Sequence, residues 1–154
     1  MDADGRNVRQ LTNNETHDSS ANWSPDGDRI SFQSDRDGDW EIFVMDTHGA
    51  KVRQLTNNDD HDGPANWSPD GKHIVFDSER DGDSEIFVMD DYGKNVRQLT
   101  FNENIDAWPH WSPAGDRIVF DSDRYGDWEI FVTDAYGIDT YSTGQHGRNK
   151  GFGG

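Results

Sequence analysis

Residues 23–56 carry the stretch that decides the fold, WSPDGDRISFQSDRDGDWEIFVMDTHGAKVRQLT. Its closing phrase, VRQLT, begins at a valine in each of three copies, Val8, Val52 and Val96. Positions 8, 52 and 96 are 44 residues apart, and the tryptophan that opens the stretch recurs at the same spacing, at Trp23, Trp67 and Trp111. No insertion separates the copies, so the chain consists of one unit repeated along its length.

One unit contains four segments with the pattern of β-strands, residues 18–24, 29–33, 40–45 and 52–56. In the second segment, apolar Ile30 and Phe32 alternate with polar residues, as in a strand whose two faces differ. Short turns rich in Pro, Asp and Gly separate the segments. A unit of about 40–50 residues with four short strands is typical of a β-propeller blade. The sequence therefore predicts an all-β chain of three four-stranded antiparallel blades.

Two prolines indicate where the first strand of a blade lies. Pro64 and Pro109 fall within that strand, and proline cannot donate a hydrogen bond to a neighbouring strand. We therefore expect the first strand at an edge of its sheet, facing the central channel, and the VRQLT strand at the outer rim.

The net charge of −17 and the absence of Cys exclude several classes of function. Binding of nucleic acid or of an anionic membrane needs clustered Lys and Arg, so neither is expected as a partner. Cations and basic proteins fit the charge better. Without Cys there are no disulfides, thiolate metal sites or cysteine nucleophiles. No apolar run approaches 18 residues and no signal peptide is recognisable at the start.

The residues shared by the copies give the pattern NxxxxDxxPxWSPDGxxIxFxSxRDGDxEIFVMDxxGxxVRQLT. This pattern resembles the repeat of TolB-type propellers, the Pro-Asp relatives of WD-repeat proteins. The resemblance spans residues 1 to about 137. It implies a six-bladed ring and a periplasmic or extracellular location. Members of this family include propellers that bind other proteins, propellers that gate oligopeptidases and polysaccharide lyases, so the fold alone does not choose a function.

Three blades are fewer than the four to eight or so that close a propeller, and they leave two blade faces uncovered. We therefore predict a homodimer in which two half-rings form one six-bladed ring. The outer strand predicted over residues 6–12 has no inner strands before it, whereas residues 140–144 read Thr-Tyr-Ser-Thr-Gly where VRQLT is due. Each N-terminal strand is expected to pair with Glu129–Thr133 of the other chain.

Two alternatives to the homodimer stay open. The first is that the chain is a fragment of a longer propeller. The second is that its tail forms a rim strand of its own despite its composition. In either case residues 1–137 are expected to form the propeller part, and the Gly-rich residues 138–154 a flexible tail.

Three aspartates are candidate metal ligands. Asp18, Asp62 and Asp106 each precede the repeat tryptophan by five residues, at the entrance to the innermost strand. In a closed ring they would form a circle of carboxylates suited to Ca²⁺ or another hard cation. The alternative is that each Asp accepts hydrogen bonds from a neighbouring loop, as aspartates in turns commonly do.

Other motifs carry less chemistry. His17 and His61 precede two of those aspartates, but adjacent residues of a strand point to opposite faces, so packing or solvent exposure is expected for them and for His110. Residues 35–41 superficially resemble a calcium loop, but the glycine is misplaced and the flanks are strands, so a hairpin turn is predicted. The surrounding carboxylates are expected to pair with the arginine of this turn in each of the three units, Arg36, Arg80 and Arg124.

The sequence therefore predicts a binding or scaffolding module and not an enzyme. No GxSxG motif occurs, and a unit repeated three times gives no single catalytic constellation. A protein or peptide, or a cation, is the expected ligand of the central channel. The alternatives are a propeller domain of an enzyme, of the polysaccharide-lyase or oligopeptidase-gating type, and an amplified or engineered array without an evolved ligand.

Overall fold

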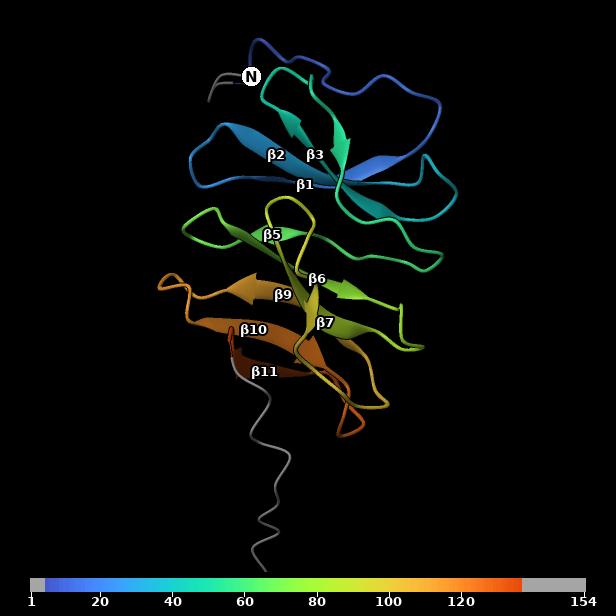
Figure 1. Ribbon diagram of the computed structural model, residues 1–154, viewed down its shortest axis with the longest axis vertical. Coiled ribbons are helices and arrows are strands. Elements are labelled where there is room, and N and C mark those ends of the chain that lie inside the picture. Colours follow the sequence, from blue (N-terminus) through green and yellow to red (C-terminus); the bar gives the residue numbers. More distant parts are fainter. Residues whose placement is uncertain (1–4, 137–154) are drawn as a thin grey trace, which may run out of the picture.

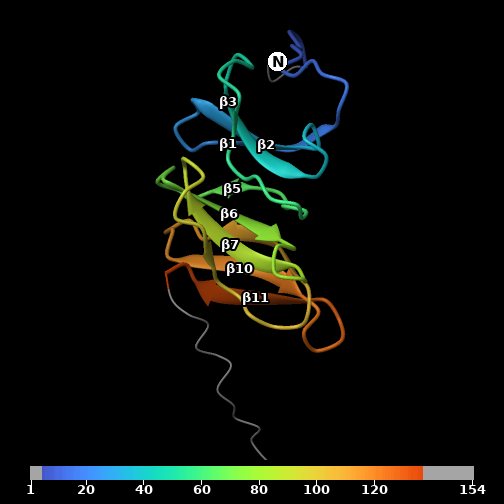
Figure 2. The same ribbon diagram turned by 45° about the vertical axis from the view of Figure 1, so that its right-hand side comes forward.

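The computed structural model describes residues 5–136, in which every regular element is a β-strand. The strands form three antiparallel sheets, called blades 1 to 3, which stack one on the next (Figures 1 and 2). Blade 1 contains β1 (Asp18–Trp23), β2 (Arg29–Ser34), β3 (Glu41–Asp46) and β4 (Arg53–Gln54). Blade 2 contains β5 (Asn66–Trp67), β6 (His73–Ser78), β7 (Glu85–Asp90) and β8 (Arg97–Gln98). Blade 3 contains β9 (Asp106–Trp111), β10 (Arg117–Ser122) and β11 (Glu129–Asp134).

The order within each sheet follows the chain, so the first strand lies at one edge, as Pro64 and Pro109 predict. The register of β1 and β9 is irregular at Ser20 and Trp108, which have positive φ angles of 52° and 53°. Proline, whose φ is fixed near −65°, cannot adopt that conformation. At Pro64 the irregularity is replaced by a shorter strand, and β5 keeps only two residues.

The turn between the first two strands has the chemistry that its sequence predicts. The N–H of Gly27 donates to the carbonyl of Ser24 at 2.9 Å, with a φ of 76° that favours glycine. The Ser24 hydroxyl accepts the N–H of Arg29 at 2.9 Å and so fixes the start of β2. The same turn recurs in blades 2 and 3 at Gly71 and Gly115.

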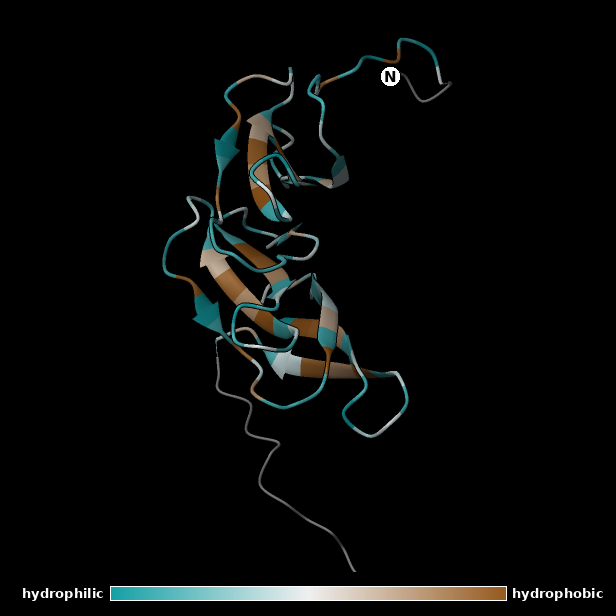
Figure 3. Ribbon diagram, turned by 90° about the vertical axis from the view of Figure 1, so that its right-hand side faces the viewer, coloured by the Kyte–Doolittle hydropathy of each residue, from teal (hydrophilic) through white to brown (hydrophobic). Residues whose placement is uncertain are grey.

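The apolar core lies between the blades. Ile42 and Val44 of β3 pack against Phe76 and Met89 of blade 2, and the equivalent residues of blade 2 pack in the same way against blade 3. Figure 3 shows the apolar residues concentrated on the strands in the middle of each sheet. Each blade thus covers a face of the next, as expected for a repeat whose single unit has too thin an apolar layer of its own.

The VRQLT phrase makes a shorter strand than its sequence predicts. Only Arg53 and Gln54 are paired with β3 as a strand, although the N–H of Leu55 still donates to the carbonyl of Ile42 at 2.8 Å. The side chain of Leu55 is buried against the next blade. In the described part of a single chain, residues 6–12 belong to no sheet, and their predicted partner strand is in a second copy. Residues 138–154, predicted as a tail, lie outside the described residues. The described part contains no helix long and apolar enough to cross a membrane.

Candidate functional site

The three aspartates predicted as metal ligands each pair with an arginine of the same blade. Arg80 reaches Asp62 at 2.9 Å and Arg124 reaches Asp106 at 2.7 Å, and both carboxylates are fully buried. Asp18 is 3.0 Å from Arg36. The arginines predicted to pair with carboxylates therefore do so. Each ion pair connects the turn between the second and third strands of a blade to the start of its first strand.

An asparagine completes each of these sites. Asn58 donates to Asp62 at 2.9 Å, and Asn14 donates to Asp18 at 2.8 Å. Partial burial of Asp18 raises its pKa, but hydrogen bonds from Ser34, Asn14 and Arg36 outweigh this and lower it. Within residues 5–136 of one chain, no three His, Asp or Glu side chains are grouped to hold a metal ion. The predicted ring needs carboxylates from two chains, so calcium binding stays a prediction.

A second set of carboxylates, which the sequence analysis did not single out, lies between the blades. Glu41 is fully buried, accepts the backbone N–H of Asn58, and faces the carboxyl group of Asp62. Glu85 makes the equivalent contacts with Asn102 and lies beside Asp106. Burial, opposed in part by hydrogen bonds, raises the pKa of each glutamate to about 7. The signal was present in the sequence, because a glutamate opens the EIFV phrase in all three copies.

In the part of one chain that the structure describes, no blade follows the third copy of this glutamate. Glu129 is exposed, and so are Ile130 and Val132, with 69% and 54% of their surface accessible. The equivalent residues of blades 1 and 2 are buried, Glu41, Ile42, Val44, Glu85, Ile86 and Val88. These exposed residues of β11 are called the C-terminal face of blade 3.

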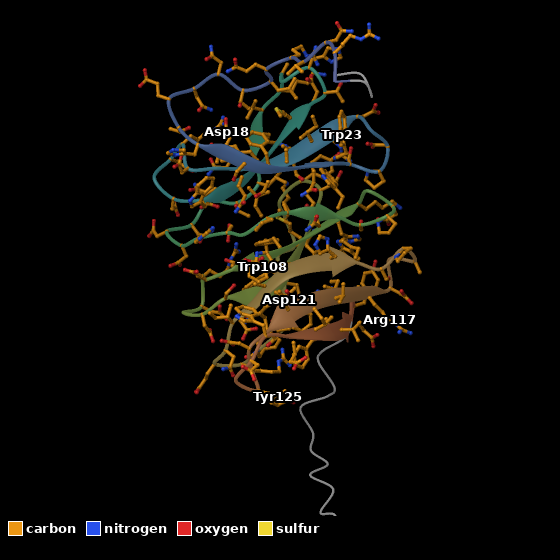
Figure 4. The ribbon with its side chains drawn as sticks, turned by 180° about the vertical axis from the view of Figure 1, so that it is seen from behind. Asp18, Trp23, Trp108, Arg117, Asp121 and Tyr125 are labelled. Carbon is orange, nitrogen blue, oxygen red and sulfur yellow. The ribbon has the colours of Figure 1, made fainter. Side chains whose placement is uncertain are left out.

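The opposite end of the stack has an open pocket. Leu11, Ala21, Phe32 and Met45 contribute to its lining, and its volume is about 230 Å³. The equivalent four residues of the next unit belong to the buried cluster that Ile42 and Val44 enter, Leu55, Ala65, Phe76 and Met89. We call this surface the N-terminal face of blade 1. Figure 4 labels Asp18 and Trp23 at the two ends of its inner strand.

A cleft with a volume of about 590 Å³ lies between blades 2 and 3. Its lining includes two tryptophans, three carboxylates and one histidine, Trp108, Trp128, Asp77, Glu79, Asp83 and His61. The rings of Trp108 and Trp128 have centroids 5.3 Å apart and planes tilted by 39°. Trp108 lies on β9, beside the labelled Asp121 in Figure 4.

Asp77 connects the two blades that form this cleft. Its carboxylate accepts the backbone N–H of Trp108 at 3.1 Å. At the first blade interface the equivalent residue is Gln33, whose amide donates to the carbonyl of Asp62 at 2.7 Å. Gly63 leaves room for the Asp77 side chain, because a Cβ there would lie 2.0 Å from Oδ2. Burial raises the pKa of Asp77 to about 6.

The histidines do not converge with the aspartates that follow them. His17 pairs with Asp35 at 2.8 Å, on the β2–β3 turn, while Asp18 points to Arg36. His61 is exposed at the mouth of the cleft, and His110 is exposed on β9. Residues 35–40 form the hairpin turn between β2 and β3 that the sequence predicts within 35–41, with Gly38 at a φ of 122°.

Comparisons with known proteins agree with the blades just described. The family model of the TolB beta propeller domain matches residues 1–76 and 57–150. No curated protein matches the chain. The structure is similar to that of TolB from Acinetobacter baumannii, with 27% identity over 87% of this chain and 34% of that one, and a TM-score of 0.79.

Two further solved structures extend the comparison. A putative TolB from Agrobacterium tumefaciens is 29% identical over 81% of this chain and 48% of its own length, with a TM-score of 0.70. An oligogalacturonate lyase in complex with manganese shares the fold at 20% identity over 85% of this chain and 39% of that one, with a TM-score of 0.66. The chain spans less than half the length of each of these proteins. Since the family model matches nearly the whole sequence, the chain belongs to the TolB β-propeller domain family.

Proposed function

We propose that the chain is a non-enzymatic binding module, a TolB-like half-propeller whose ring is completed by a second copy and whose channel side receives a protein or peptide. The observation that carries this proposal is the match between the two end faces of the stack. The C-terminal face of blade 3 and the N-terminal face of blade 1 carry the two halves of the contact that joins successive blades inside the chain.

The apolar halves of that contact correspond residue by residue. Between blades 1 and 2, Ile42 and Val44 are buried in the pocket that includes Leu55, Phe76 and Met89. On blade 1 the equivalent pocket opens to the surface, although Phe32 and Met45 are themselves buried, and on blade 3 the equivalent side chains, Ile130 and Val132, are exposed. Covering such side chains contributes roughly 25 cal/mol per Å² of apolar surface.

The polar halves correspond as well. Glu129 is the exposed counterpart of Glu41. On blade 1, Asp18 accepts hydrogen bonds from Asn14 and Arg36. Asp62, which lies beside Glu41, accepts the same bonds from the equivalent residues of blade 2. Beside the inner strands, the guanidinium of Arg29 lies 4.5 Å from the ring centre of Trp67. The equivalent pair at the ends is Arg117 and Trp23, both labelled in Figure 4 and both exposed.

The N-terminal segment lies where the outer strand of a preceding blade would run. Arg53 donates to the carbonyl of Asp91, and Arg97 donates to that of Ala135, so each outer strand contacts the following blade. Arg9 makes the same contact with the carbonyl of Thr47 at 2.6 Å. Figure 3 shows this segment reaching past blade 1. This placement supports pairing of residues 6–12 with Glu129–Thr133 of a second copy.

Two such joints close a ring of six blades when the copies are related by a two-fold axis. The repeated Asp and Glu side chains described above bond to Arg, Asn and backbone groups of the blades. These carboxylates therefore hold the blades together, which supports a binding role for the module over a catalytic one. By resemblance to TolB proteins, we place the module in the periplasm or outside the cell. The likeness to the lyase carries no activity to this chain.

The proposal is tested by the mass of the chain in solution, measured by light scattering at micromolar concentration. We expect twice the chain mass of 17.5 kDa. Ile130→Asp should give the single-chain mass, because it places a charge where an aliphatic side chain must be buried. The matched control is Phe101→Asn. Phe101 is 64% exposed and belongs to neither end face, and the other two units have an asparagine at this position, Asn13 and Asn57.

A wild-type chain that runs as a folded single chain would contradict the closure. In that case the two end faces are covered by something other than a second copy. Circular dichroism of Ile130→Asp shows whether the variant keeps the β structure of the wild type.

A further inference from the structure

The cleft between blades 2 and 3 exists because this interface departs from the repeat. At the first interface, Trp40 lies between the rings of His17 and His61, with centroids 6.4 Å from each. At the second interface, Ser84 stands at the position of Trp40, which leaves the space open. Gly63 and Trp108 also depart from the other copies, and both line this cleft. Three departures from the unit therefore meet at one place.

The two tryptophans present their rings to this space. Trp108 is 52% exposed and Trp128 is 49% exposed. Trp108 has a φ of 53°, a conformation that is strained for a bulky residue and that the surrounding fold must hold. Blade 1 has the small Ser20 in the same conformation. The backbone thus tolerates a small residue here, and the large exposed indole is an addition specific to this cleft.

The charge around the tryptophans is negative. Asp77, Glu79 and Asp83 line the cleft, and no Lys or Arg is among the described residues that line it. None of these three carboxylates forms an ion pair in the described part of the chain. The face of an indole ring attracts cations through its quadrupole, and carboxylates beside it add to that attraction.

We propose that this cleft binds an organic cation, an alkylammonium or guanidinium group held against Trp108 and Trp128 and neutralised by the carboxylates of the rim. A cleft of about 590 Å³ has the size of a site for a small molecule or an amino-acid side chain. The net charge of −17 raises the local concentration of cations. A neutral sugar could also stack on the indoles, but it would leave three carboxylates without a counter-charge.

The inference needs no residue of a second copy, because all the lining residues belong to blades 2 and 3 of one chain. It names a ligand chemistry that the proposed function does not specify. Failure of one proposal therefore leaves the other standing.

The test is isothermal titration calorimetry of the whole chain at pH 7.5 and low salt. The cationic probes are N-acetyl-lysine amide, N-acetyl-arginine amide and spermidine. The neutral probes are N-acetyl-norleucine amide, N-acetyl-citrulline amide and glucose. We expect a dissociation constant of order 1 mM or tighter for the cations, and at least about tenfold weaker binding of the neutral probes.

Trp108→Ser places at this position the residue type of Ser20, which has the same positive φ in blade 1, so the variant should fold. It should bind the cations about tenfold more weakly than the wild type because one indole ring is lost. Tyr92→Ser removes an exposed aromatic of the outer rim and should bind like the wild type. Stronger binding of spermidine identifies a free amine as the preferred source of the cation, and stronger binding of the amino-acid amides identifies a basic peptide side chain.

Equal binding of cationic and neutral probes, an unchanged affinity in Trp108→Ser, or no binding of any cation would each overturn the proposal. Repeating the titration with Ile130→Asp separates the two proposals. Cation binding that persists in this variant supports a site within one chain, and its loss there would overturn that placement.

Discussion

Glu41 and Glu85 occupy an unusual place for charged residues, because each lies buried between two apolar blades. Their hydrogen bonds to Thr, Asn and the backbone favour the carboxylate, but burial and the nearby Asp favour the protonated acid and prevail. Each glutamate thus holds a proton at pH values where an exposed glutamate has lost it. The interface between blades is therefore sensitive to pH near neutrality.

The pH dependence of stability follows from the direction of this shift. The folded chain keeps the Glu85 proton up to a pKa of about 7, whereas the unfolded chain releases it near 4.5. Between these values only the unfolded state loses the proton, so the free energy of unfolding falls as the pH rises through this window. Between pH 5 and pH 8, the free energy of unfolding should fall by about 1–2 kcal/mol less in Glu85→Gln than in the wild type, because the variant has no proton to release at this position.

Urea denaturation of wild type and Glu85→Gln at several pH values measures this effect. The exposed Glu15→Gln is the control and should follow the wild-type pH profile. If Glu85→Gln also kept the wild-type slope, Glu85 would be ionised in the folded protein and the interface would be insensitive to pH.

At the residue scale the sequence predicts part of the site. The pairing of Arg36 with a carboxylate and the separation of His17 from Asp18 follow from turn chemistry and strand alternation. The approach of Glu41 to Asp62 could not be predicted, because these two residues lie on successive blades and meet only when the blades stack. The unit shows which residues recur, but not how the units meet.

Among the elements, the outer strand differs most from its sequence prediction. Two residues pair within the blade, and the next one, Leu55, crosses to the following blade. Its carbonyl oxygen would lie 2.4 Å from a Cβ at Gly93. Strand propensity predicts the whole VRQLT phrase as a strand. The N–H of Leu55 still donates to Ile42 of β3, but the N–H of Ile42 is accepted by the side-chain hydroxyl of Thr56 at 2.9 Å, and the regular strand pairing does not continue. The inner strands and tight turns, which depend on local chemistry, agree closely with prediction.

Two glycines separate the cost of backbone conformation from the cost of this close approach. Gly27 and Gly93 have φ angles of 76° and 78°, but a Cβ at Gly27 would meet nothing within 4 Å. Gly27→Ala should therefore cost about 1–2 kcal/mol of stability. Gly93→Ala should cost at least about 2 kcal/mol more, because Leu55 must move.

Urea denaturation of the two glycine variants measures the difference. A similar loss of stability in both would show that the outer strand can shift away from Gly93 at little cost. The crossing of Leu55 would then contribute little to blade packing.

At the scale of the whole molecule, residues 5–136 form a stack of blades with two unlike ends, and this arrangement decides how the proposed second copy would fit. Sequence periodicity predicts the number of described blades and their order. It cannot predict that residues 6–12 follow the surface of blade 1 as an outer strand would, because that placement depends on Arg9 and Leu11 contacting the β3–β4 turn.

Removal of residues 1–12 tests the strand exchange separately from the apolar contact. The shortened chain should have the mass of one chain in light scattering, because blade 3 of each copy would lack a rim strand and the pocket on blade 1 would lack Leu11. A shorter deletion of residues 1–5, which keeps the VRQLT phrase, should leave the mass of two chains. Persistent dimers in the longer deletion would show that the faces associate without exchange of the strand.

The placement of the N-terminal segment along blade 1 also bears on how such rings arise. The proposed contact between copies repeats a contact already present within each chain. Fusing two genes in tandem would therefore change an association between molecules into a covalent connection, with a linker as the only new part. A half-ring of this kind needs no invented interface to become a single-chain propeller, and duplication alone supplies the missing blades.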